Sequence, residues 1–116
     1  MSGRRSRNKG ASGEREVVTL CNDAQLGTTF RRCRQAEHGE HRACVPDIDA
    51  DARTRWPFWC EVKRQVRPNV RAALAQATAD CHDGRVPIAV TRADREDWLV
   101  TLPFADFLRM VRSRLQ

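Results

Sequence analysis

The chain of 116 residues has no tyrosine and only four phenylalanines, so its core has few aromatic side chains to draw on. It has no apolar stretch of membrane-spanning length, and no secretory apolar segment follows the basic N-terminus. These absences argue against a membrane or secreted protein, and we expect a soluble, cytoplasmic one. A hydrophobic content of 41% and three tryptophans are typical of one folded domain.

The five cysteines include no Cys-x-x-Cys pair. Their odd number and scattered positions argue against a disulfide framework. Cys21, Cys60 and Cys81 fall at apolar-face positions of predicted elements, so we interpret them as small core residues.

Lysine is also scarce: Lys9 and Lys63 are the two lysines, and the other basic residues counted in the net charge are all arginines. The formal net charge is +6 and the pI is about 9.7. Guanidinium groups suit bidentate contact with phosphates. The excess of positive charge therefore favours a polyanionic partner.

We expect a flexible basic arm at residues 1–9, followed by a single domain at residues 10–116. Hydrophobic periodicity and turn signals predict an α/β chain with the element order αβββαββα. The predicted helices cover residues 12–25, 69–81 and 103–115, and the predicted strands cover residues 28–34, 43–50, 58–64, 86–91 and 98–102.

The first predicted helix carries a carboxylate on its core-facing side. Glu14, Val17, Val18 and Cys21 share one stripe at helical spacing, whereas Glu16 should face outward. Ser12 is the expected N-cap. A carboxylate on an inward stripe requires a positive group above it.

The last predicted helix is amphipathic. Its arginine-rich side is expected to be solvated. Its apolar side consists of Phe104, Phe107, Leu108, Val111 and Leu115.

The strand at residues 58–64 carries an acid and a lysine on one face. Alternation places Glu61 and Lys63 opposite Cys60 and Val62, and Asp47 lies near the end of the preceding strand. Two carboxylates that share a divalent cation, next to a lysine, suit metal-assisted phosphodiester cleavage. The alternative is a solvated ion pair on an edge strand. The positions of Asp47 and Glu14 make us favour the metal site.

Three motifs occur in order: KGASGERE at residues 9–16, PDI at residues 46–48 and CEVKR at residues 60–64. Together they resemble the PD-(D/E)XK nuclease superfamily and, within it, the archaeal and phage Holliday-junction resolvases. The resemblance implies a restriction-endonuclease-like mixed β-sheet flanked by helices. It also implies dependence on Mg²⁺, for which Mn²⁺ can substitute, and a homodimer that cuts four-way DNA junctions.

Carried over by position, the resemblance gives a catalytic set of Glu14, Asp47, Glu61 and Lys63. The metal ligands would be Asp47, Glu61 and the backbone carbonyl of Val62, with Glu14 binding directly or through water. Weaker candidates for the site are Gln76 and Asp49.

DNA contacts are expected from basic residues of the arm and of the strand at residues 28–34. The loop at residues 34–42 lacks the Gly/Ser-rich character common in resolvases, which bears on how substrate is positioned. The expected contact residues are Arg4, Arg5, Arg7, Lys9, Arg31, Arg32 and Arg34.

Cys33, His38, His41 and Cys44 form a C-x4-H-x2-H-x2-C pattern of zinc-ligand types. The His-x2-His spacing is unusual for zinc. We therefore favour two plain cysteines and two exposed or phosphate-facing histidines over a structural zinc site.

The first functional hypothesis is a Mg²⁺-dependent, structure-selective endonuclease, a Holliday-junction resolvase of phage or prophage origin. The second is a nicking or repair endonuclease with the same site. The others are a nuclease-like protein that binds DNA without cutting it, and a zinc-binding nucleic-acid adaptor.

Overall fold

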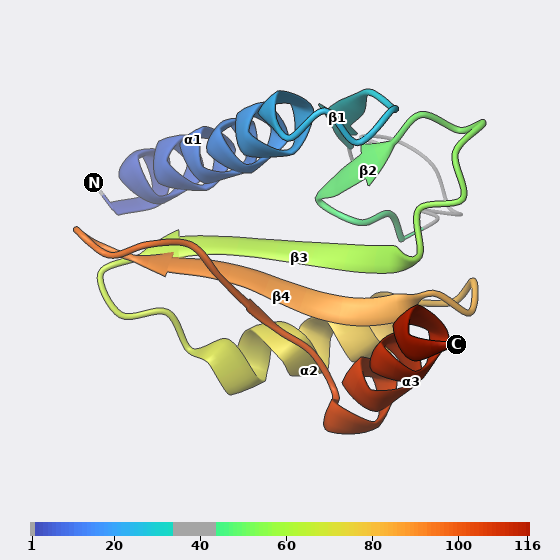
Figure 1. The fold of residues 1–116 in the computed structure, drawn as a ribbon. Coiled ribbons are helices and arrows are strands. Elements are labelled where there is room, and N and C mark those ends of the chain that lie inside the picture. The colour runs from blue at the N-terminus through green and yellow to red at the C-terminus, as the bar shows by residue number, and fades with distance from the viewer. Residues whose placement is uncertain (1, 34–43) are drawn as a thin grey trace.

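The computed structural model describes the backbone of residues 2–33 and 44–116, and the side chains of residues 10–33 and 44–116. Its elements follow the predicted order αβββαββα (Figure 1). They are α1 (Ser2–Asp23), β1 (Phe30–Arg32), β2 (Ile48–Ala50), β3 (Phe58–Gln65), α2 (Val70–Asp80), β4 (Val86–Ala93), β5 (Leu99–Thr101) and α3 (Phe104–Leu115).

The five strands form one mixed sheet in the order β1-β2-β3-β4-β5. The β3 and β4 strands run parallel and are joined by α2, while the other neighbouring pairs run antiparallel. Since adjacent parallel strands need a crossover connection, α2 lies against one face of β3 and β4. The α1 helix lies on the opposite side of these strands (Figure 1). The predicted restriction-endonuclease-like α/β fold is confirmed.

The main core lies between α1 and the sheet. Val17 of α1 packs with Ile48, Cys60, Val62 and two residues of β4, while Val18 and Cys21 pack against the edge of this cluster. The predicted inward stripe of the first helix is therefore confirmed. Because β3 side chains alternate, Glu61 and Lys63 lie on the other face of the strand, toward α2.

The start of α1 differs from the prediction. The helix begins at Ser2, so residues 2–9 of the expected arm are helical and Ser12 does not cap the helix. The α2 helix starts as predicted, because the side chain of Asn69 accepts a hydrogen bond from the backbone N–H of Ala72 at 3.0 Å.

The strands before the site are shorter than predicted. The β2 strand begins only at Ile48, so Asp47 directly precedes it. Among the described helices, none combines the length and apolar character needed to cross a bilayer.

Candidate active site

Backbone hydrogen bonds fix Asp47 beside β3. Its N–H donates to the carbonyl of Cys60 at 2.9 Å, and its own carbonyl accepts from the N–H of Cys33 at 2.9 Å. Its carboxylate oxygen Oδ2 accepts from the N–H of Val62 at 2.7 Å. The carboxylate is therefore held against the backbone at the centre of β3, where Glu61 begins the ExK motif.

Asp47 and Glu61 form a close pair of acids that is largely buried. Glu61 is only 6% exposed. Burial raises the pKa of Asp47 to about 7, and the negative charge of Glu61 and a hydrogen bond with it add to the rise. Burial also raises the pKa of Glu61, against the lowering effect of Lys63. Both carboxyl groups therefore hold a proton more readily than they would in water.

Lys63 supplies the nearest positive charge. Its Nζ atom lies 3.5 Å from Oε2 of Glu61, and about a third of its side chain is exposed to solvent. Residues 61 and 63 share a strand face, so alternation alone brings them together. The ammonium group can therefore contact both the acid pair and a ligand arriving from solvent.

Glu14 approaches the same region from α1. Its Oε1 atom accepts a charge-assisted hydrogen bond from Nε of Arg32 at 2.9 Å. Burial raises the pKa of Glu14, and the charge of Asp47 adds to this rise, while Arg32 and Lys63 lower it. Arg32 is the positive group that the inward position of Glu14 required.

The four side chains of the expected catalytic set thus lie in one region. They do not form a ready three-acid cage, since within the described residues no three His, Cys, Asp or Glu side chains are grouped closely enough to hold a metal ion. The closest acids are Asp47 and Glu61, while Glu14 is engaged by Arg32.

The close approach of α1 to β3 depends on Gly13. A Cβ atom at this position would lie 2.9 Å from Cβ of Arg64 and 3.5 Å from the indole of Trp98. Because Glu14 is the next residue, this glycine sets how near the Glu14 carboxylate comes to the strand.

The remaining sequence candidates lie in varied settings. Arg31 is exposed and donates to Sγ of Cys33 at 3.5 Å. Asp49 is turned to Arg85, with an ion pair of 2.8 Å, and Gln76 is exposed on α2. Five of the expected DNA-contact residues have side chains outside the described part of the chain: Arg4, Arg5, Arg7, Lys9 and Arg34.

Two of the four residues in the Cys/His pattern, His38 and His41, also lie outside the described part. Cys33 is half-buried, Cys44 is exposed, and both are free thiols. They line a cavity of about 270 Å³ together with His82, whose Nε2 atom lies 3.0 Å from the carbonyl of Cys44.

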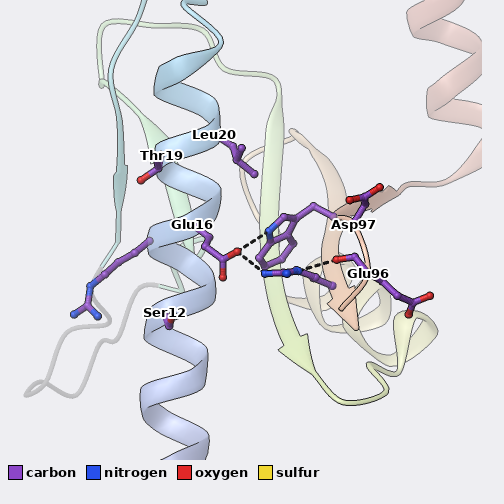
Figure 2. Close-up of a pocket in the computed structure, with 9 residues that line it drawn as sticks. Ser12, Glu16, Thr19, Leu20, Glu96 and Asp97 are labelled. Atoms are coloured by element: carbon purple, nitrogen blue, oxygen red, sulfur yellow. Dashed lines mark hydrogen bonds and ion pairs between the residues drawn. The ribbon is translucent and has the colours of Figure 1, made fainter. Parts of the chain in front are cut away.

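The sequence analysis missed an ion-pair network around Glu16. This residue was expected to face outward, which is wrong. Its Oε1 atom accepts hydrogen bonds from Arg92 at 2.6 Å and from the indole N–H of Trp98 at 3.3 Å (Figure 2). Arg64 lies 3.4 Å from Oε2. The one sequence signal for this role is that Glu16 is the second acid of the ERE motif at residues 14–16. The network ties α1 to β3 and β4 on the side of the helix away from Glu14.

A family model described as "Phage putative PDDEXK endonuclease" matches residues 5–114 of the chain. Searches of the curated proteins and of the solved structures gave no match. The family match spans nearly the whole chain, including all three motifs and the fold described above. The chain therefore belongs to the phage PDDEXK endonuclease family and is a nuclease of the PD-(D/E)XK superfamily.

Proposed function

We propose that the protein is a Mg²⁺-dependent, structure-selective DNA endonuclease that resolves four-way junctions. The observation that carries the proposal is the Asp47–Glu61 pair beside Lys63, with the Asp47 carboxylate anchored to the backbone of Val62. Membership of a nuclease family supports DNA as the substrate.

The donor atoms suit a hard divalent cation. Burial raises the pKa values of these two adjacent carboxyl groups, and a bound cation would favour their charged forms. Asp47, Glu61 and the backbone carbonyl of Val62 offer only oxygen, which Mg²⁺ and Mn²⁺ prefer. When bound, such an ion polarises a phosphate and lowers the pKa of a water molecule.

The other side chains have roles that their contacts support. Lys63 would stabilise negative charge that develops on the phosphate, because its ammonium group is both near Glu61 and open to solvent. Glu14, held by Arg32, would orient a water or join the ligand set from the α1 side. Exposed Arg31 would contact a phosphate flanking the scissile one.

Resolution of a four-way junction requires two cuts in two strands, so we further propose that two copies act together. Recognition would follow DNA shape, since the contacts expected from arginines fall on the backbone and carry no sequence information. Membership of a phage family supports the proposal that the protein acts in the cytoplasm of a host cell.

Cleavage of matched, labelled four-way junction, flap and linear duplex with Mg²⁺ tests the proposal. The wild type is compared with Glu61→Ala and with Asp23→Asn, which alters an exposed acid at the end of α1. Paired symmetric nicks in the junction alone, lost in Glu61→Ala and kept in Asp23→Asn, support resolution. Equal cutting of all three substrates indicates a general nicking or repair nuclease, and tight binding without cutting indicates a non-cleaving protein.

A further inference from the structure

The sheet is joined unevenly around the acid pair. The β3 and β4 strands are long and pair along their whole length of eight residues each (Figure 1). The short β2 strand pairs with β3 at one position, where Ile48 lies opposite Cys60. Asp47 directly precedes Ile48 and Glu61 directly follows Cys60, so this one step of the ladder brings the two acids together. A strand held by so few ladder bonds is easily displaced, and its position depends on contacts outside the ladder.

The side chain of Arg85 makes such a contact. Arg85 directly precedes β4 in the chain. Its guanidinium lies over the ring of Trp59 in β3, with Cζ 5.3 Å from the ring centre, and Nη1 donates to the carbonyl of Phe58 at 3.2 Å. The same Nη1 donates to Oδ1 of Asp49 in β2 at 2.8 Å. One side chain therefore joins the start of β4 to β3 and β2.

Asp83 fixes the orientation of Arg85. Its Oδ2 atom accepts from Nε of Arg85 at 2.8 Å, and its Oδ1 atom accepts from the backbone N–H of Arg85 at 3.2 Å. Two carboxylates and one carbonyl thus share a single guanidinium, whose side chain is only 19% exposed. The fixed fork of donors in arginine suits this arrangement, whereas the single ammonium of lysine cannot reproduce it.

His82 provides a second contact on the other side of Asp47. Its Nε2 atom lies 3.0 Å from the carbonyl oxygen of Cys44, three residues before Asp47. Its ring packs edge-on against Trp59, with ring centres 5.1 Å apart. The ion pair with Arg85 holds the chain two residues after Asp47. Residues 81–85, between α2 and β4, therefore hold the chain both before and after the catalytic aspartate.

The contacts of Asp49 favour a supporting role over direct metal binding. Its Oδ1 atom accepts from Arg85 and also from the backbone N–H of Ala50 at 2.9 Å. An oxygen atom with two donors is a poor ligand for a cation. Asp49 is therefore better explained as the point where Arg85 grips β2.

We propose that Arg85 and His82 are positioning residues, which hold the segment around Asp47 against β3 and so set the separation of Asp47 and Glu61. Their importance for metal binding rests on the proposed function. Their effect on the position of Asp47 requires neither metal nor DNA.

The first test uses metal-free protein and measures hydrogen exchange of the Val62 amide by nuclear magnetic resonance. This N–H donates to Oδ2 of Asp47, so its exchange reports whether that carboxylate stays in place. Arg85→Gln should speed the exchange by about tenfold, while the amides that bond β3 to β4 keep their rates. Arg109→Gln is the matched control, because it breaks an ion pair of the same 2.8 Å length on α3, and it should leave Val62 unchanged.

The second test measures Mn²⁺ affinity by electron paramagnetic resonance. Arg85→Gln should raise the dissociation constant by about tenfold, as is typical when a group that orients a metal ligand is removed. The direction of the change is decisive, because loss of a nearby positive charge would by electrostatics alone tighten the binding of a cation. His82→Phe keeps a ring against Trp59 but removes the hydrogen-bond donor, and it should weaken binding in the same direction.

Urea unfolding checks that each variant is folded. If Arg85→Gln does not fold, Asp49→Asn removes the charge that pairs with Arg85 and leaves the bonds of Arg85 to Asp83 and Phe58, and exchange of the Val62 amide is read in that variant. Val62 exchange that matches the wild type overturns the proposal, and so does unchanged or tighter Mn²⁺ binding by Arg85→Gln. Faster Val62 exchange in a protein whose wild type binds no Mn²⁺ would count against the proposed function and leave the positioning role standing.

Discussion

The carboxylate of Asp47 accepts a hydrogen bond of 2.7 Å from the backbone N–H of Val62, the residue between Glu61 and Lys63. This bond ties the Pro-Asp motif to the centre of the Glu-x-Lys motif. It fixes the Asp47 carboxylate at β3 through a backbone group, so the position of that carboxylate does not depend on a side-chain rotamer of β3.

Removal of the charge of either Asp47 or Lys63 should stop cleavage and leave DNA binding intact. We expect Asp47→Asn and Lys63→Ala each to lower the cleavage rate at saturating DNA by about 100-fold or more, because both groups act on charge at the reacting phosphate. Single-turnover rates and dissociation constants measured on the same junction separate the two effects. A loss of binding in proportion to the loss of cleavage would contradict these roles.

Gly13→Ala should destabilise the protein despite the better helix propensity of alanine. Its methyl group would meet Cβ of Arg64 at 2.9 Å, an overpacked contact that typically costs about 1–3 kcal/mol. Gly10→Ala, in the same helix with open space around it, is the control and should stabilise by up to about 1 kcal/mol. Urea unfolding gives both free energies, and equal effects of the two variants would disprove the close approach.

Arg32 and Arg31 should have different effects although they are adjacent. Arg32→Ala releases Glu14, so the pKa of Glu14 should rise further and cleavage at saturating DNA should fall by about tenfold. The loss should be greater at pH 6 than at pH 8. Arg31→Ala removes an exposed cation, so it should weaken binding and reduce the salt slope by about 1. Similar binding losses with unchanged rates in both variants would show that Arg32 serves only as a phosphate contact.

Without metal, the acid pair should make stability depend on pH. Burial and the charge of Glu61 raise the pKa of folded Asp47 from its ordinary value near 3.8 to about 7. The folded state then binds the proton more tightly than the unfolded state. The stabilisation from that proton is full below pH 3.8 and is lost as the pH rises through 7.

The difference in unfolding free energy between wild type and Asp47→Asn should therefore shift in favour of the variant between pH 5 and pH 8. Urea unfolding in a chelating buffer at both pH values provides the measurement. A difference that stays constant, or moves in favour of the wild type, would mean that Asp47 is already neutralised by other groups.

The sequence predicted the positions that local rules determine. Alternation on one strand places Glu61 next to Lys63, and helical spacing turns Glu14 inward with Val17. Asp47 follows from its motif, although the hydrogen bond to Val62 requires the register of β2 against β3, which no short pattern encodes.

The positions that the sequence mispredicted depend on tertiary contacts. Periodicity places Glu16 on the polar side of its helix. Its partners Arg64, Arg92 and Trp98 come from much later in the chain, so helical spacing alone does not reveal them. An amphipathic pattern shows that α3 has an apolar side, but it does not show which surface covers that side. The start of α1 at Ser2 was not predicted, because residues 2–9 are polar and show no hydrophobic periodicity.

Metal binding by the acid pair is the central claim, and Mn²⁺ titration followed by electron paramagnetic resonance tests it most directly. The free-ion signal should fall on addition of wild type or Asp23→Asn protein, and should not fall with Asp47→Asn or Glu61→Gln. Equal Mn²⁺ binding by all four proteins, or none by the wild type, would contradict the assignment of Asp47 and Glu61 as the ligands.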